Sequence, residues 1–248
     1  MGPRVRLAAA GLFAALLGAG IVGQILPDAP APGDKPPLGL FTSLPIYWAE
    51  SADIADALDA GANGGHWARV ALERDNRLVP LDTLDGLELK RLGRLVMAQP
   101  RPLAPVENVA LDNWVRGGGR LLLFADPFLT EHSRFVLGDR RRPQGMVLLS
   151  PILKRWGLEL RFDEGQGQGE RSETVDGMTI PIDMAGTLAP AEPGAPSDCT
   201  IATGGLLATC RIGAGEVTVV ADAALLDRDR DARTGVPVLA QLVDRAFD

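Results

Sequence analysis

A complete strand–helix–strand unit lies at residues 94–127, and it constrains the fold of this chain more than any other stretch. The first strand is expected at 95–98, where an apolar run ends at Gln99 and a proline. Residues 121–125 (LLLFA) are continuously apolar, which is typical of a parallel strand buried on both faces. Two parallel strands joined by a helix form a right-handed crossover unit. The unit therefore predicts an α/β fold with a mostly parallel, open sheet and crossover helices.

The connecting helix is expected to begin at Pro105 and to end at the three glycines of 117–119. Proline is tolerated in the first turn of a helix, and glycine readily adopts the left-handed conformation that often ends one. Apolar residues recur between these limits at helical spacing, which predicts that they face the core: Val106, Val109, Ala110, Trp114 and Val115.

The size and charge of the chain exclude some functions. About 220 residues remain after an N-terminal apolar segment, enough for one main domain with a sizeable core. The formal net charge is −7, which argues against a general nucleic-acid binder. Only two histidines occur, and neither has a partner at metal-ligand spacing, so we predict no metal and no other cofactor. A loop metal site at His132, Asp126 and Glu131 is the alternative.

Residues 7–26 carry no charge and are long enough to cross a bilayer as a helix. Arg4 and Arg6 precede them, so the positive-inside rule places the bulk of the chain outside the cytoplasm. We expect a single-pass protein of the inner (cytoplasmic) membrane with a periplasmic domain. A cleaved signal peptide, with a poor cleavage site at 29–31, is the alternative.

The predicted organisation has three parts. A membrane anchor or signal segment at 1–26 is followed by a proline-rich, stiff tether at 27–37. The α/β domain occupies 38–248 and carries an antiparallel extension at about 163–212, where hairpin patterns replace strand–helix patterns.

The two cysteines, Cys199 and Cys210, suit an oxidising compartment. A two-residue turn at Gly204 and Gly205 would place the cysteines opposite each other in a hairpin. They are therefore predicted to form a structural disulfide, since they lack the C-x-x-C spacing of an exchange motif.

The remaining elements are predicted from apolar runs and from the glycine, proline and polar residues that bound them. Strands are expected at 38–42, 78–81, 158–162 and 217–221, a hairpin at 173–180, and helices at 51–58, 66–75, from Ser150 and from Pro237. The proline in 78–81 suggests an edge strand. A long loop at 127–149 contains three consecutive arginines at 140–142, and loops of that length are usually functional or mobile.

The candidate site lies beyond the carboxyl ends of the parallel strands, where ligands bind in open α/β sheets. Polar and aromatic side chains follow two of these strands, and we predict that they bind a ligand or partner: Ser43, Tyr47, Trp48, Asp126, His132 and Arg134.

Other functions of these residues remain open. A hydrolase that uses Ser43, His132 and Asp126 is the alternative function, although Ser43 does not lie in a G-x-S-x-G turn. Tyr47 and Trp48 would also suit a hydrophobic contact with a partner. The arginines at 140–142 would suit lipid headgroups or an acidic partner.

Two blocks of sequence, LGLFTSLP at 38–45 and RPLAPVENVALDNWVRGGGRLLLFADP at 101–127, resemble the extracytoplasmic auxiliary domain of gliding-motility-type ABC transporter proteins. The resemblance covers about residues 38–128 and extends more faintly to GAGEVTVVADAALL at 213–226. It implies a fold similar to class I glutamine amidotransferases, with a flavodoxin-like fold as the other option. The amidotransferase G-x-C-x-G turn has no match in this chain.

The resemblance also implies a function and partners. The chain would be a non-catalytic, membrane-anchored accessory or binding subunit that works with a separate permease and ATPase. It has no ATP-binding motif and one potential membrane span, so it could not transport a substrate alone.

Overall fold

The computed structural model describes residues 35–50, 65–192 and 198–248. The predicted membrane segment at 7–26, most of the tether and the helix expected at 51–58 lie outside these residues. Within the described ranges, no helix is both long and apolar enough to cross a membrane.

A seven-stranded sheet forms the centre of the domain, and its first five strands are parallel. Their order corresponds to the doubly wound order 2-1-3-4-5, and β10 and β9 extend the sheet in antiparallel fashion. The strands are, in spatial order, β2 (Arg77–Pro80), β1 (Pro37–Thr42), β3 (Arg94–Ala98), β4 (Arg120–Phe124), β11 (Gly215–Val220), β10 (Leu207–Ile212) and β9 (Cys199–Ile201). The predicted mixed α/β fold with a mostly parallel sheet is confirmed, and β2 lies at the edge as predicted.

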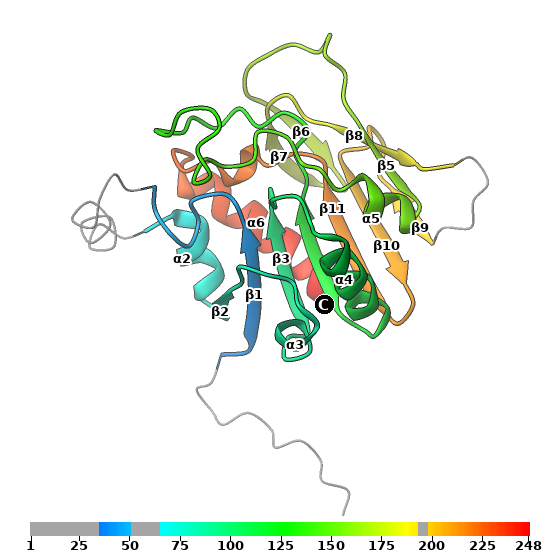
Figure 1. Ribbon diagram of the computed structural model, residues 1–248. Helices are drawn as coiled ribbons and strands as arrows, with labels where there is room; N and C mark the ends of the chain where they lie inside the picture. Colours follow the sequence, from blue (N-terminus) through cyan, green and yellow to red (C-terminus); the bar gives the residue numbers. More distant parts are fainter. Residues whose placement is uncertain (1–34, 51–64, 193–197) are drawn as a thin grey trace, which may run out of the picture. The chain divides into compact units, whose positions relative to one another are not determined.

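Helices cover both faces of the sheet (Figure 1). One face carries α3 (Gly86–Leu89), α4 (Pro105–Arg116) and α5 (Ser150–Arg155), and the other carries α2 (Trp67–Glu73) and α6 (Ala232–Phe247). The inner parallel strands β1, β3, β4 and β11 are largely buried between these layers, whereas the edge strand β2 is partly exposed. This double coverage explains why the strands are continuously apolar in the sequence.

The predicted limits of α4 are confirmed, and so are three of the five residues of its predicted inward face, because Val115 is buried and Ala110 and Trp114 pack against the core. The other two residues are exposed, so this part of the prediction is wrong. Val106 and Val109 are 73% and 60% exposed, whereas Leu111 and Val115 are buried together with two acidic residues, Glu107 and Asp112. Hydrophobic periodicity assigns carboxylates to the solvent side. Glu107 and Asp112 can be buried here because hydrogen bonds compensate the loss of water around their carboxylates. The inward face of α4 therefore differs in part from the face that its apolar residues predict.

The expected start of the last helix is also wrong. α6 begins at Ala232 rather than at Pro237, because the side chain of Asp231 accepts a hydrogen bond from Arg233 N and caps an earlier turn. Pro237 therefore lies inside the helix, where it forgoes one backbone hydrogen bond.

The stretch at about 163–212 forms two antiparallel pairs outside the main sheet. A hairpin joins β6 (Arg171–Val175) to β7 (Met178–Ile182), and β8 (Thr187–Pro190) pairs with β5 (Leu158–Arg161). The β6–β7 turn has positive φ at Asp176 (50°) and Gly177 (82°), as the Asp-Gly signal predicts. β9 and β10, in contrast, belong to the main sheet, so this stretch is not separate from the parallel core.

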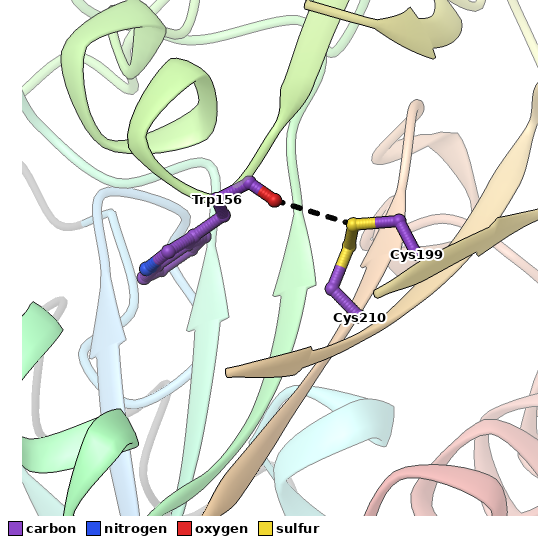
Figure 2. Close-up of a disulfide and its surroundings, with 3 residues drawn as sticks. All are labelled: Trp156, Cys199 and Cys210. Atoms are coloured by element: carbon purple, nitrogen blue, oxygen red, sulfur yellow. Dashed lines mark hydrogen bonds between the residues drawn. A yellow bond between two sulfur atoms is a disulfide. The ribbon is translucent and has the colours of Figure 1, made fainter. Parts of the chain in front are cut away.

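The predicted disulfide between Cys199 and Cys210 is present (Figure 2). Its predicted register is also confirmed, since the two residues lie opposite each other on β9 and β10. The carbonyl oxygen of Trp156 lies 3.3 Å from Cys199 Sγ, which brings the end of α5 against the disulfide. The bond thus stabilises the outer edge of the sheet.

Candidate functional site

Ser43 and Gln99 follow β1 and β3 at the point where the strand order reverses, which is where ligands bind in doubly wound sheets. The Ser43 hydroxyl donates a hydrogen bond to Gln99 O and accepts one from Gln144 N at 3.0 Å. Ser43 N also donates to Gln99 O. The end of β1 is therefore bound both to the end of β3 and to the loop at 127–149.

The side chain of Gln99 is completely buried and joins three segments of backbone. Its Nε2 donates to Asp126 O at 3.0 Å and to Gln144 O at 2.8 Å, while its Oε1 accepts from Asp126 N at 3.0 Å. Both N–H groups and the oxygen of the Gln99 amide are therefore hydrogen-bonded within the protein.

Asp126 and Asp222 lie two residues beyond the ends of β4 and β11, and both are fully buried. Asp126 accepts hydrogen bonds from Phe128 N (2.7 Å) and Ala223 N (3.3 Å). Asp222 accepts from Ala224 N and from Asp183 N (3.0 Å). The two carboxyl groups therefore fix the turns that leave β4, β7 and β11.

Burial is the main cause of an unusual protonation state of this pair. It raises the pKa of Asp126 to about 7, against the effect of the bonds from Phe128 N and Ala223 N. Burial and then the nearby charge of Asp126 raise the pKa of Asp222 well above its ordinary value, and Asp183 contributes to both. The two carboxyl groups therefore titrate as a coupled pair, at a higher pH than exposed aspartates do.

The loop at 127–149 passes the carboxyl ends of β1 and β3 and is drawn in green in Figure 1. Val147 N donates to Asp126 O (3.0 Å) and Leu129 N donates to Gly145 O (2.9 Å), so the two arms of the loop are held together. No helix or strand occurs between β4 and α5. The loop is therefore held mainly by the polar groups at the strand ends.

The loop that follows β1 contacts the far part of the 127–149 loop through Glu50. Ser133 Oγ and Arg134 N donate to the two carboxylate oxygens of Glu50, at 2.6 and 3.0 Å. Tyr47 is half-buried, whereas Trp48 is 72% exposed and lies edge-on to the Tyr47 ring.

The structure thus places the six predicted site residues at one end of the sheet but not in one constellation. Ser43 and Asp126 are engaged by backbone groups, as described above. His132 is exposed. In the ranges that the structure describes, no hydrogen bond joins His132 to Ser43 or Asp126, and no group of three or more His, Cys, Asp or Glu residues is arranged to hold a metal ion.

A further acid with a raised pKa, the half-buried Glu131, lies in the 127–149 loop. Burial raises the pKa of Glu131 to about 7, and the charge of Asp227 adds to this effect. His66 is buried at the start of α2, where its Nδ1 accepts a hydrogen bond from Ala68 N (3.1 Å). Burial and then the charge of Arg228 lower the pKa of His66 to about 4, so this histidine is neutral at physiological pH.

A sizeable groove lies away from the predicted site. It has a volume of about 620 Å³ and lies between α3 and α4 at the amino ends of β3 and β4. Four of the five residues that were expected to face the core line it: Val106, Val109, Ala110 and Trp114. No charged residue other than Lys90 lines it.

Sequence reasoning missed Gln99, Asp222, Gln144 and Glu50 as parts of this end of the sheet. One signal was available for Asp222. An Ala-Asp pair directly follows both β4 and β11, which are neighbours in the sheet. Gln99 had no comparable signal, because its role depends on the backbone groups that the fold brings around it.

Comparisons with known proteins give only distant likenesses in structure. No protein-family model and no curated protein matches the sequence. A putative ThuA-like protein from Bacteroides uniformis ATCC 8492 is 12% identical, with a TM-score of 0.47, over 90% of this chain and 97% of that chain.

Two glycosidases also have similar regions. The exo-β-1,4-mannosidase Op5Man5 from Opitutaceae bacterium strain TAV5 is 16% identical over 85% of this chain, with a TM-score of 0.45. The β-galactosidase Gan42B from G. stearothermophilus is 12% identical over 85% of this chain, with a TM-score of 0.49. This chain covers only 33% and 30% of these two enzymes. Likenesses at this level leave activity and substrate unassigned.

Proposed function

We propose that this chain is a membrane-anchored, extracytoplasmic accessory or binding subunit of an ABC-transporter-like complex, without catalytic activity of its own. Separate permease and ATPase subunits would be its partners. The membrane segment at 7–26 and the family resemblance at 38–128 motivate the location and the partners.

One observation in the structure carries the non-catalytic part of the proposal. At the point where doubly wound enzymes hold their substrates, Ser43, Gln99 and Asp126 are hydrogen-bonded to backbone groups of the 127–149 loop and its neighbours. A serine nucleophile requires a base within hydrogen-bond reach, and the partners of the Ser43 hydroxyl are backbone groups instead. These polar groups support a surface loop, which favours a function in binding.

Cys199 and Cys210 support the proposed location. Their disulfide pairs two strands of the main sheet, and disulfides persist in oxidising compartments such as the periplasm. It does not distinguish between an anchored and a secreted chain.

Co-purification tests the proposal directly. The full chain is produced in its native host, and its membranes are treated with a short cross-linker that does not require amines. The chain is then purified in mild detergent. We expect a multispanning membrane protein and an ATPase to be recovered with it, and not with an unrelated single-pass protein of similar size. A monodisperse chain without partners would contradict the proposal.

The alternative function, hydrolysis through Ser43, His132 and Asp126, is tested with the same preparation. The wild-type chain and its Ser43→Ala variant are compared in a broad screen of esters and glycosides. Turnover by the wild type that disappears in the variant would establish the hydrolase and overturn the non-catalytic proposal.

A further inference from the structure

The exposed apolar side chains of this domain are concentrated in the 127–149 loop. Of the ten large hydrophobic residues that are exposed in the described ranges, five lie in this loop, and a sixth lies in the neighbouring loop after β1. These six are Trp48, Phe128, Val136, Leu137, Met146 and Leu148. Val136 and Leu137 are the most exposed, at 76% and 87%. Apolar side chains gathered in this way mark interaction surfaces.

The loop is held in place before any partner binds. Its first turn is fixed by the bond from Phe128 N to Asp126, its return arm by the bonds from Gln144 and Val147, and its middle by Glu50. A surface fixed in this way loses little conformational entropy on binding, which increases affinity. The buried polar groups at the strand ends therefore have a function outside catalysis.

The charge of the loop is opposite to that of the whole chain. It contains four arginines, at 134 and at 140–142, against two carboxylates, Glu131 and Asp139. Arg141 pairs with Asp139 at 2.8 Å and also lies over the Phe135 ring, while Arg140 is exposed beside them. The whole chain has a formal net charge of −7, so this local excess of arginine selects an acidic partner.

The position of the loop favours a protein over a lipid surface as that partner. The chain enters β1 at Pro37, at the amino ends of the parallel strands, and the loop lies at their carboxyl ends. A strand of this length separates the two ends by about 20 Å. The described chain therefore begins at the end of the sheet opposite to the loop.

We infer that the 127–149 loop, together with Trp48, is a preformed docking surface for a protein partner that presents carboxylates around an apolar pocket. Val136 and Leu137 enter the pocket, and the exposed Arg140 and Arg141 contact its acidic rim. The inference rests on the proposed function, because it assigns the surface through which an accessory subunit would contact its complex.

Site-specific photo-cross-linking identifies the occupant. A benzoylphenylalanine replaces Leu137 in the full chain in native membranes, and the same replacement at Val106 on α4 is the matched control, since both residues are exposed and apolar. We expect a cross-link at position 137 to a protein segment that contains acidic and apolar residues, and none to that segment at position 106. A cross-link at 137 to lipid, to residues 1–34 of the same chain or to a second copy would overturn the inference.

Substitutions measure the contribution of each part of the surface. Leu137→Ser and Arg140→Glu are each expected to reduce recovery of the partner by about tenfold, as for the loss of one well-packed or charged interface contact. Val106→Ser and Lys154→Glu, which are exposed outside this surface, should leave recovery unchanged. Thermal unfolding checks that all four variants fold.

The outcomes separate the two proposals. If the wild type recovers a multispanning partner and the loop variants recover as much, the docking surface is wrong and the accessory function stands. If the wild type recovers no partner, the accessory function fails and the docking surface fails with it. Recovery that falls in the loop variants and in the controls alike would also contradict the inference.

Discussion

Gln99 holds a left-handed backbone conformation at the end of β3, with a φ of 43°. This region is unfavourable for any residue with a Cβ. The compensation comes from its side chain, which forms three hydrogen bonds with the backbone of Asp126 and Gln144. The side-chain amide of Gln99 therefore stabilises the strand ends, whereas its strained backbone destabilises the fold.

Two substitutions of Gln99 separate these effects. Gln99→Ala loses the three bonds and keeps the strained backbone, so we expect it to lower the free energy of unfolding by about 3 kcal/mol. Gln99→Gly loses the same bonds but relieves the strain, and it should cost about 1 kcal/mol less. Urea unfolding of both variants measures the difference. A glycine variant less stable than the alanine variant would contradict this account.

At the scale of elements, the outer edge of the sheet depends on a covalent link. β9 has three residues, and among the strands of the described ranges it pairs with β10 alone. The disulfide between Cys199 and Cys210 therefore fixes the short edge strand where few hydrogen bonds do so.

Removal of the disulfide should destabilise the domain without changing its fold. Cys199→Ala combined with Cys210→Ala is expected to lower the free energy of unfolding by about 2–3 kcal/mol, since the bond closes a short loop of the unfolded chain. Chemical denaturation gives this value. Thiol titration of the unfolded, unreduced wild type serves as the control, and two free thiols would show that the bond does not form.

The two acidic residues on the inward side of α4 explain why the orientation of this helix could not be predicted. Asp112 accepts hydrogen bonds from Arg116, Arg155 and Trp156 Nε1, and it thereby joins α4 to α5. Its partners are up to 44 residues away in the sequence. A local sequence pattern contains no information about such distant partners. A prediction from that pattern therefore places the carboxylate in solvent.

At the scale of the whole molecule, buried titratable groups act in opposite directions on stability. Asp126 and Glu131 keep a raised pKa, about 7 in each case, so the folded chain holds protons that the unfolded chain has already released. Their contribution to the free energy of unfolding is fully present below about pH 4 and is lost as the pH rises through 7. His66, with its pKa lowered to about 4, contributes above its ordinary value of 6.5 and loses this contribution as the pH falls.

A difference measurement isolates Asp126. The free energy of unfolding of the wild type minus that of Asp126→Asn should decrease as the pH rises from 5 to 7, by at most about 1.4 kcal/mol per pH unit. Asp139→Asn is the control. The hydrogen bonds from Arg141 lower the pKa of Asp139 to about 2, so its difference should not vary over this range. A flat difference for Asp126→Asn would show that this carboxyl group is not protonated in the fold.

The location of the whole chain is a further prediction. In vesicle flotation, the full chain should remain with the membrane after carbonate extraction, because residues 7–26 suit a bilayer. Leu16→Arg combined with Leu17→Arg should release it, since each arginine costs about 3 kcal/mol at the centre of a membrane helix. Leu137→Arg, in the exposed loop, should not. A mature chain that begins near residue 31 would identify a cleaved signal peptide instead.

Much of the architecture was predictable from residues close together in the sequence. The apolar runs at 95–98 and 121–125, the glycines at 117–119 and the Asp-Gly turn in the β6–β7 hairpin each determine local backbone geometry, and all were predicted correctly. The pairing of Cys199 with Cys210 was predictable for the same reason, since one tight turn sets the register.

Only the tertiary structure decided which polar groups are buried and what they do there. Gln99, Asp126 and Asp222 are ordinary polar residues after strands in the sequence, and their burial depends on backbone donors and acceptors from distant segments. Hydrogen bonding of this kind is set by three-dimensional proximity, which no local pattern encodes. The sequence therefore determined the sheet and its helices. Only the fold decided that polar groups at the strand ends hold an exposed, arginine-rich loop in place.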